Sequence, residues 1–396
     1  MALQSPFHPR VAPLCTSYAW KQWSGYHAVN HYGETHLTEY WAFREACAVT
    51  DVTPLFKYAV EGRDAARLLS RMTVRSFESM RVGRVAYCCW CDERGKVIDD
   101  GTVSRLGEQR FFVTAAEPTL SWMGRLSRGL DVEIADVSER IAALSLQGPT
   151  SREVLRRCSD ADLDKLKYFG TTRARLDGVD ARISRTGYTG DLGYELWCDA
   201  ADALKLWDAV TSAGRSYGLE PAGIDALDMV RIEAGFIMLG VDYHSSPRVT
   251  IDARRSTPYE IGLDWCVELD RDAFLGQDAL RAEAARGPAW KMVGVEADWR
   301  ALEELYASYD LPPALAPAAS RAPLPLYAGG AFVGQVTSSV WSPLLKRHLG
   351  LASIQASHAA LGTRVELEHT VLHERRRVAA TVVERPFFDP ERRRKP

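Results

Sequence analysis

The sequence predicts a mixed α+β protein of two or three domains, and three observations support this. The chain has 396 residues, which is long for a single hydrophobic core. A strand that ends in glycine and leads into a helix occurs twice, and antiparallel strands follow each copy. The hydrophobic fraction is 46%, as in ordinary globular proteins. These features predict two related sheet-and-helix units with further chain beyond them.

The first of these units begins at residues 59–69 (AVEGRDAARLL) and the second at residues 145–155 (SLQGPTSREVL). Asp64 and Thr150 occupy positions suited to the first turn or N-terminal cap of the two helices. The alternating and turn-forming residues that follow predict three strands in each unit, at 84–90, 96–106 and 111–115, and at 172–176, 179–184 and 195–198.

Charge and composition exclude several classes of function. The formal net charge is −3, which gives no general attraction to nucleic acid. No run of about 18 apolar residues is present, so no membrane span is expected. Residues 1–15 lack the apolar core of a secretion signal. We therefore expect a cytoplasmic protein without nucleic-acid or membrane partners, and we expect the basic run at 392–395 to be a solvated tail.

A glycine-rich segment at residues 184–195 (SRTGYTGDLGYE) is the most informative part of the chain. Three glycines within seven residues allow a tight turn, and Glu195 follows on a strand-like run. A carboxylate fixed in this way can accept paired donors from a planar heterocycle. The alternative is an ordinary hairpin turn with an exposed glutamate.

Two adjacent carboxylates, Asp99 and Asp100, lie in the middle of a predicted strand. Neighbouring strand residues face opposite ways, so one should face outward and the other inward beside Tyr87 and Trp90. A buried aspartate near aromatic rings has a raised pKa unless it finds a donor. If the two related sheets face one another, this carboxylate lies opposite Glu195, and the pair can hold a flat ligand and move its protons. The alternative is that both aspartates are solvated charges on an edge strand.

The cysteines favour structural roles over metal binding. Cys88, Cys89 and Cys91 cluster on one predicted strand, with Cys88 on the face opposite the other two. A zinc site needs a second pair of ligands, and no second C-x-x-C or H-x-x-x-H is present. We therefore expect buried thiols that act as small apolar side chains, and no metal.

An ordered series of short blocks resembles the aminomethyltransferase superfamily, whose best-known member is the T-protein of the glycine cleavage system. The resemblance extends over residues 43–388. The blocks are CDERGKVIDD at 91–100, LQGP at 146–149, the glycine segment, PAGID at 221–225, RIEAG at 231–235, EIGLDW at 260–265, FLG at 274–276, GQVTSS at 334–339 and WSP at 341–343. Context of this kind gives short motifs their specificity.

The resemblance implies a three-domain cloverleaf with tetrahydrofolate in a central cavity. Residues 1–286 would form two interleaved α/β units, and residues 287–396 a C-terminal β-barrel. The resemblance assigns Asp100 the catalytic role, near the reacting folate nitrogens. It places five residues around the cofactor: Tyr87, Tyr188, Glu195, Arg231 and Trp265.

Several positions depart from the usual T-protein pattern. Residues 51–56 read DVTPLF, which looks more like the folate-binding halves of enzymes that oxidise dimethylglycine and sarcosine. Thr114 replaces a pocket asparagine and Leu227 an arginine. The segment 299–325 is longer than usual, with five prolines and a short apolar-patterned helix at Leu302, Leu305 and Tyr306. These departures place docking of a lipoyl carrier protein in doubt and indicate a paralogue.

The expected function is tetrahydrofolate-dependent transfer of a methylene or methyl group between a small substrate and N5 of the cofactor. Alternatives within the resemblance are a T-protein proper and an N-, O- or S-demethylase. A non-catalytic folate-binding protein is a third class, disfavoured because the block 273–277 (AFLGQ) lacks the cysteine of that branch. The chain has no G-x-G-x-x-G fingerprint, so any partner oxidase must be a separate protein.

Overall fold

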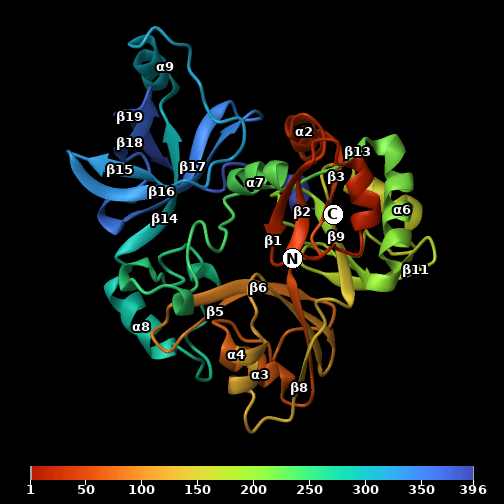
Figure 1. Cartoon of the computed structure of the whole chain (residues 1–396). Coiled ribbons are helices and arrows are strands. Elements are labelled where there is room, and N and C mark those ends of the chain that lie inside the picture. Colours follow the sequence, from red (N-terminus) through yellow and green to blue (C-terminus); the bar gives the residue numbers. More distant parts are fainter. Residues whose placement is uncertain (1, 396) are drawn as a thin grey trace.

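The computed structural model describes residues 2–395, arranged as three lobes around a common centre (Figure 1). Two lobes are sheets covered by helices, with five and six strands, and the third is a closed six-stranded barrel. The predicted α+β class with a C-terminal barrel is confirmed. No helix within this described range is long and apolar enough to cross a bilayer.

The first unit is a sheet in the order β5-β6-β7-β4-β8. Helices α3 and α4 cover the face that carries Cys88 and Trp90. The predicted strands of this unit are confirmed. The bounds are β4 Phe56–Glu61, α3 Ala65–Met72, β5 Val85–Cys91, β6 Val97–Gly107, β7 Arg110–Ala115, α4 Leu120–Leu126 and β8 Glu133–Asp136.

The second unit is a sheet in the order β10-β11-β12-β9-β3-β13, with α5 and α6 packed on one face. Strand β3 (Cys47–Asp51) belongs to this sheet although it precedes the first unit in the chain, so the two units are interleaved as expected. The remaining bounds are β9 Ile141–Gln147, α5 Ser151–Cys158, β10 Thr171–Leu176, β11 Val179–Ser184, β12 Gly193–Asp199, α6 Ala203–Gly214 and β13 Leu219–Pro221.

The barrel closes in the order β14-β17-β16-β15-β18-β19. Helix α9 (Trp299–Ala307) packs on it through Leu302 and Tyr306, which confirms the helix expected in the longer segment. The strand bounds are β14 Trp290–Ala297, β15 Leu324–Ala328, β16 Ala331–Ser342, β17 Arg347–Gln355, β18 Arg364–Val371 and β19 Glu374–Val383.

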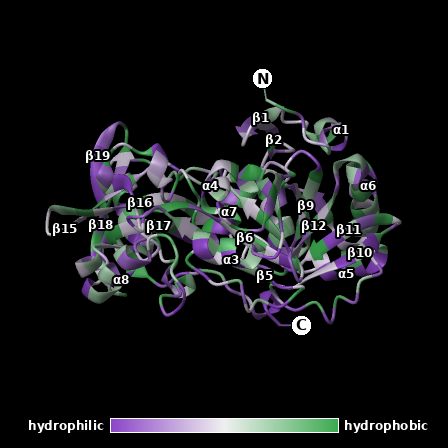
Figure 2. Cartoon of the chain, turned by 90° about the horizontal axis from the view of Figure 1, so that it is seen from below, coloured by the Kyte–Doolittle hydropathy of each residue, from purple (hydrophilic) through white to green (hydrophobic). Residues whose placement is uncertain are grey.

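The remaining elements join the lobes. Helix α7 (Ile224–Glu233) lies at the centre and packs on α2 (Leu37–Glu45), and α8 (Gln277–Arg286) precedes the barrel. A hairpin of β1 (Ala19–Trp23) and β2 (Tyr26–His31) follows the short helix α1 (His8–Val11). Figure 2 shows that the two ends of the chain lie on opposite faces of the molecule.

Candidate functional site

Asp100 lies on strand β6 and is held by two tyrosine hydroxyls. The Tyr87 hydroxyl on β5 donates to Oδ2 at 2.7 Å, and the Tyr243 hydroxyl donates to Oδ1. Tyr87 can reach this carboxylate because it is paired with Thr102, two residues along β6 on the same face. Sequence reasoning missed Tyr243, because it lies in an irregular segment after α7 with no periodic pattern.

Asp99 lies on the opposite face of β6 and is fully buried. Its carboxylate accepts backbone N–H groups from Asp100 at 2.8 Å and from Glu117 at 2.9 Å. The expectation that one aspartate faces outward is therefore wrong, and β6 is not an edge strand. Trp90 is also misplaced: its strand partner is Asp99, so it lies on the core face away from Asp100.

Burial raises the pKa of both carboxyl groups, and hydrogen-bond donors oppose that rise in each. The charge of Asp100 raises the pKa of Asp99 further, and the backbone N–H groups of Glu117 and Asp100 lower it. The hydroxyls of Tyr243 and Tyr87 lower the pKa of Asp100. Both pKa values therefore lie above the ordinary aspartate value, and each carboxyl group is held by its own donors.

Two aromatic stacks flank this carboxylate. Tyr87 stacks on Trp265, with ring centroids 6.0 Å apart and an interplanar angle of 16°. Tyr188 stacks on Phe236 at 5.5 Å, and its hydroxyl donates to the Ile237 carbonyl. Trp265 is 61% exposed, which is high for an indole and leaves one side of its ring open to a ligand.

The sheets of the first two units face one another across this region. On β6 and β7, Asp100, Thr102 and Phe112 lie on one face, as the pairing of Thr102 with Thr114 requires. On β12, Glu195 and Trp197 lie on one face, and Trp197 contacts Phe112 edge-on at 5.5 Å. Glu195 therefore faces the first unit, although no contact joins it to Asp100 within residues 2–395.

Glu195 is a partly satisfied carboxylate. The Thr186 hydroxyl donates to its Oε2 at 2.5 Å. Burial raises the pKa of Glu195, and the hydroxyls of Thr186 and Ser184 oppose that rise. Its Oε1 has no hydrogen-bond partner in the described chain, so this oxygen is free to accept an N–H from a ligand. The arrangement fits a planar ring with adjacent N–H groups, such as a pterin.

The glycines before Glu195 make room for one buried glutamine. A Cβ at Gly187 or at Gly193 would lie 2.0 Å from the Oε1 atom of Gln147. This side chain is fully buried, and its amide joins the start and the end of the segment by donating to the carbonyls of Thr186 and Tyr194. Close approach, rather than turn flexibility alone, therefore requires glycine here.

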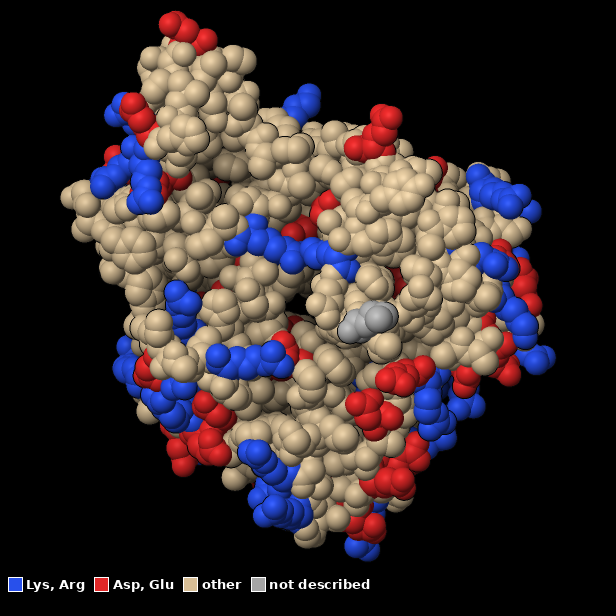
Figure 3. Space-filling view, viewed as in Figure 1, with Lys and Arg blue, Asp and Glu red and all other residues tan. Residues whose placement is uncertain are grey.

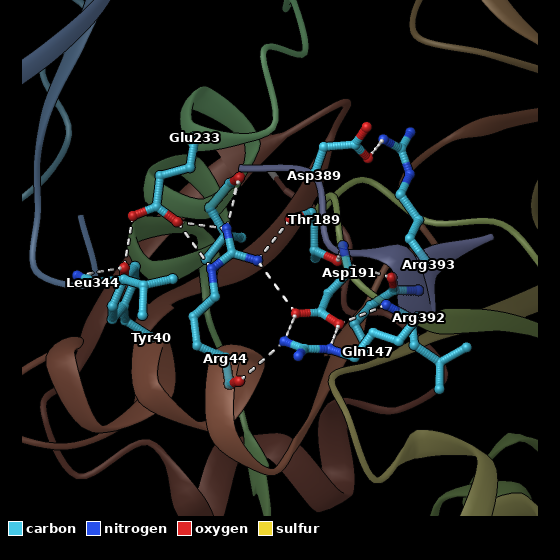
Figure 4. A network of polar contacts seen from close by, with 12 residues as sticks. Tyr40, Arg44, Gln147, Thr189, Asp191, Glu233, Leu344, Asp389, Arg392 and Arg393 are labelled. Carbon is cyan, nitrogen blue, oxygen red and sulfur yellow. Dashed lines mark hydrogen bonds and ion pairs between the residues drawn. The ribbon is translucent and has the colours of Figure 1, made fainter. Parts of the chain in front are cut away.

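An ion-pair network holds the glycine-rich segment 184–195 in place (Figure 4). Arg44 on α2 donates to the carbonyl of Thr189 at 2.9 Å and lies 3.8 Å from Asp191. Arg392 donates to both oxygens of Asp191, at 2.6 and 2.7 Å. The expectation of a solvated tail at residues 392–395 is therefore wrong, because an arginine of this run anchors the glycine-rich segment.

Arg231 is completely buried within a second ion cluster. Its Nε donates to Asp228 at 2.7 Å and its Nη1 to Asp242 at 2.5 Å, and Asp242 also accepts from Thr337 and Ser338 of the barrel. The Nη2 atom has no partner in the part of the chain that the structure describes. Arg231 thus ties α7 to the barrel, and its Nη2 remains a buried donor without a partner.

The two departures at Leu227 and in the longer segment meet at this cluster. Leu227 is buried in the core, and Arg321 from the longer segment donates to Asp228 at 2.6 Å. Burial and the charge of Arg321 lower the pKa of Lys21 on the hairpin. A guanidinium therefore reaches α7 from another part of the chain, a feature that sequence reasoning missed because it depends on tertiary contacts.

The centre of the molecule is hollowed at the surface. Figure 3 shows a narrow opening where the lobes meet, with basic side chains on both sides of it.

In residues 2–395 no group of three or more His, Cys, Asp or Glu side chains is placed to hold a metal ion. The cysteines of β5 are buried in the two cores that the sheet separates.

Comparison with known proteins identifies the family. Residues 11–271 match the GCVT N-terminal domain, and residues 313–389 match the glycine cleavage T-protein C-terminal barrel domain. An aminomethyltransferase of Streptomyces avermitilis is 35% identical over 333 residues, which cover 82% of each chain. An aminomethyltransferase of Bacillus cytotoxicus is 31% identical over 356 residues, covering 88% of this chain and 89% of that one.

A trimethylamine-oxide aldolase of Ruegeria pomeroyi is 32% identical over 408 residues. The match covers all of this chain but 48% of that protein, so the chain spans about half the length of this relative. The crystal structure of glycine cleavage system aminomethyltransferase T from Bartonella henselae superimposes with a TM-score of 0.83, at 22% identity over 98% of this chain, and has the same fold. The chain therefore belongs to the glycine cleavage T-protein (GCVT) family, with both its N-terminal and its C-terminal barrel domains.

Proposed function

We propose that the protein is a tetrahydrofolate-dependent one-carbon transferase that moves a methylene or methyl group between a small substrate and N5 of the cofactor. The observation that carries this proposal is the Asp100 carboxylate, which accepts hydrogen bonds from Tyr87 and Tyr243 while the Tyr87 ring stacks on Trp265. The relatives of this chain include aminomethyltransferases, which supports an enzymatic role for the protein.

Residues of this chain would bind the cofactor and assist the transfer. Glu195 would accept N–H groups of the pterin ring at its unpartnered Oε1. Tyr188, Trp265 and Arg231 would contact the remainder of the cofactor. When bound, the cofactor supplies the nucleophilic nitrogen that accepts the one-carbon unit. Asp100 would stabilise the positive charge that develops near this nitrogen and assist removal of its proton.

The Asp100→Asn variant tests the role of the charge. We expect folate affinity and melting temperature to stay close to wild type while single-turnover rate falls about 10²–10⁴-fold, the range for acid–base and preorganised electrostatic groups. Asp99→Asn is the matched control. It perturbs the backbone contacts at Asp100 and Glu117 and should lower the melting temperature more than the rate. If Asp100→Asn turns over normally, the carboxylate mechanism is wrong.

A second candidate function is the T-protein reaction itself, which the family match favours. Leu227 and the longer segment argue for a different substrate, since leucine cannot donate to a carboxylate or to a carrier protein. We therefore expect little glycine cleavage or synthesis with lipoylated carrier protein in a reconstituted assay. Robust activity there would establish the T-protein reaction. Product mass separates methylene from methyl transfer, because the two products differ by two hydrogens.

A further inference from the structure

A surface cleft of about 640 Å³ lies outside the central site, between the first and second units. Its walls come from β6 and β7 of the first sheet and from β10, β11 and β12 of the second. Phe112 and Trp197, which contact one another edge-on, line its inner side. A cleft of this volume is within the range of small-molecule sites.

Two arginines in this cleft are direct neighbours across paired strands. Arg173 on β10 is the register partner of Arg182 on β11, and Arg182 is in turn the partner of Trp197. Like charges directly opposite one another destabilise an antiparallel pair. Arg110 on β7 adds a third positive charge from the other unit. Together with burial, these neighbours lower the pKa of Arg182 to about 10.

Arg173 and Arg182 have no ion pair and no side-chain hydrogen bond among residues 2–395, whereas Arg110 lies opposite Glu61 of β4 in the strand register. The three aspartates of the cleft have other partners. Asp180 pairs with Arg175 at 3.1 Å, Asp160 accepts the Arg175 backbone N–H, and Asp199 accepts a backbone N–H at the start of a turn. The cleft as a whole carries both signs of charge, but Arg173 and Arg182 are not paired with its carboxylates.

We propose that this cleft is a second ligand site, for a small multivalent anion with carboxylate or phosphate groups. Arg173 and Arg182 present adjacent guanidinium groups, whose fork geometry suits such oxygens. A bound anion offsets the repulsion between these two guanidinium groups, and this relief adds to the free energy of binding. Phe112 and Trp197 add an apolar wall to the cleft.

The cleft is linked to Glu195 by a short chain of hydrogen bonds. The Trp197 indole donates to Ser184 at 3.3 Å, the Ser184 and Thr186 hydroxyls are 2.9 Å apart, and Thr186 donates to Glu195. These contacts connect the wall of the cleft to the carboxylate of the proposed cofactor site.

The test is thermal unfolding of the full chain with citrate or pyrophosphate, at constant ionic strength maintained with potassium chloride. We expect either probe to raise the melting temperature of the wild type, and the stronger of the two identifies carboxylate or phosphate chemistry. Arg182→Gln should raise the anion concentration that gives half of the maximal rise in melting temperature by at least about tenfold, because one charge-assisted contact is lost. Arg157→Gln on α5, behind the opposite face of the sheet, should leave it unchanged.

A structural role for Arg182 makes a different prediction. If the guanidinium only supports the fold, Arg182→Gln lowers the melting temperature without any anion. If it serves a ligand, the variant is as stable as the wild type or more stable, because a repulsion has been removed. The proposal is overturned by a destabilised variant, by an unresponsive wild type, or by equal responses of the Arg182 and Arg157 variants.

Discussion

Replacement of Gly193 by alanine should disrupt the cofactor site through one buried side chain. The added Cβ would lie 2.0 Å from Oε1 of Gln147, far inside van der Waals contact. Gln147 is fully buried and cannot swing into solvent. It must leave its place, and it then loses three hydrogen bonds, to Thr189, Thr186 and Tyr194, at 3.0, 3.1 and 3.2 Å. At roughly 1 kcal/mol each, Gly193→Ala should cost about 3 kcal/mol of unfolding free energy.

Urea unfolding measures this cost, and titration calorimetry with tetrahydrofolate measures its effect on the site two residues away at Glu195. We expect weaker cofactor binding together with the loss of stability. Gly33→Ala is the control, because its Cβ meets no atom within 4 Å and its backbone is not left-handed.

The Gln147→Ala background isolates the cause. With the glutamine shortened, Gly193→Ala should cost less than about 1 kcal/mol, because the clash has disappeared. Wild-type stability of the single variant would refute the reasoning. Equal cost in both backgrounds would show that β12 itself, rather than Gln147, rejects the side chain.

Three further predictions concern the site and the barrel. Glu195→Ala should weaken tetrahydrofolate binding by roughly 2–4 kcal/mol, and equal calorimetric affinities would remove Glu195 from the pocket. Arg392→Ala should lower unfolding free energy by about 1–2 kcal/mol, since Asp191 is buried while Arg392 is 41% exposed; Arg394→Ala, which removes only an exposed pair with Asp389, should cost less in the same urea titration. Burial and the nearby His369 lower the pKa of His348 to about 4. Below pH 6.5 the unfolded chain binds a proton that the folded chain does not, so stability should fall by about 3 kcal/mol towards pH 4. His348→Gln should remove most of this loss in pH-dependent melts, whereas a slope equal to that of the exposed-residue variant His373→Gln would contradict it.

The sequence predicted the fold well where local patterns decide it. Alternation and turn residues gave the strands of both units, and a run of ordered motifs gave their arrangement with the barrel. The opposite facing of Asp99 and Asp100 also follows from strand geometry alone. The burial of Asp99 does not follow from it, because that burial depends on the loop that brings the Glu117 backbone N–H to the Asp99 carboxylate.

Tertiary contacts explain what the sequence did not predict. Tyr243 lies in an irregular segment, and its contact with Asp100 depends on how that segment crosses the first sheet. Arg392 belongs to a run of basic residues that looks solvated, yet Asp191 binds it. Arg321 reaches Asp228 because the longer segment folds back over α7. In each case, a distant partner determines the role of a side chain whose local sequence is uninformative.

The placement of β3 has a consequence for how the protein is made. A ribosome delivers β3 before the whole first unit, yet its two neighbours, β9 and β13, emerge only afterwards. The first unit can complete its own sheet during synthesis, while the apolar strand β3 remains unpaired. Non-local pairing of this kind slows folding and leaves an edge open to other chains.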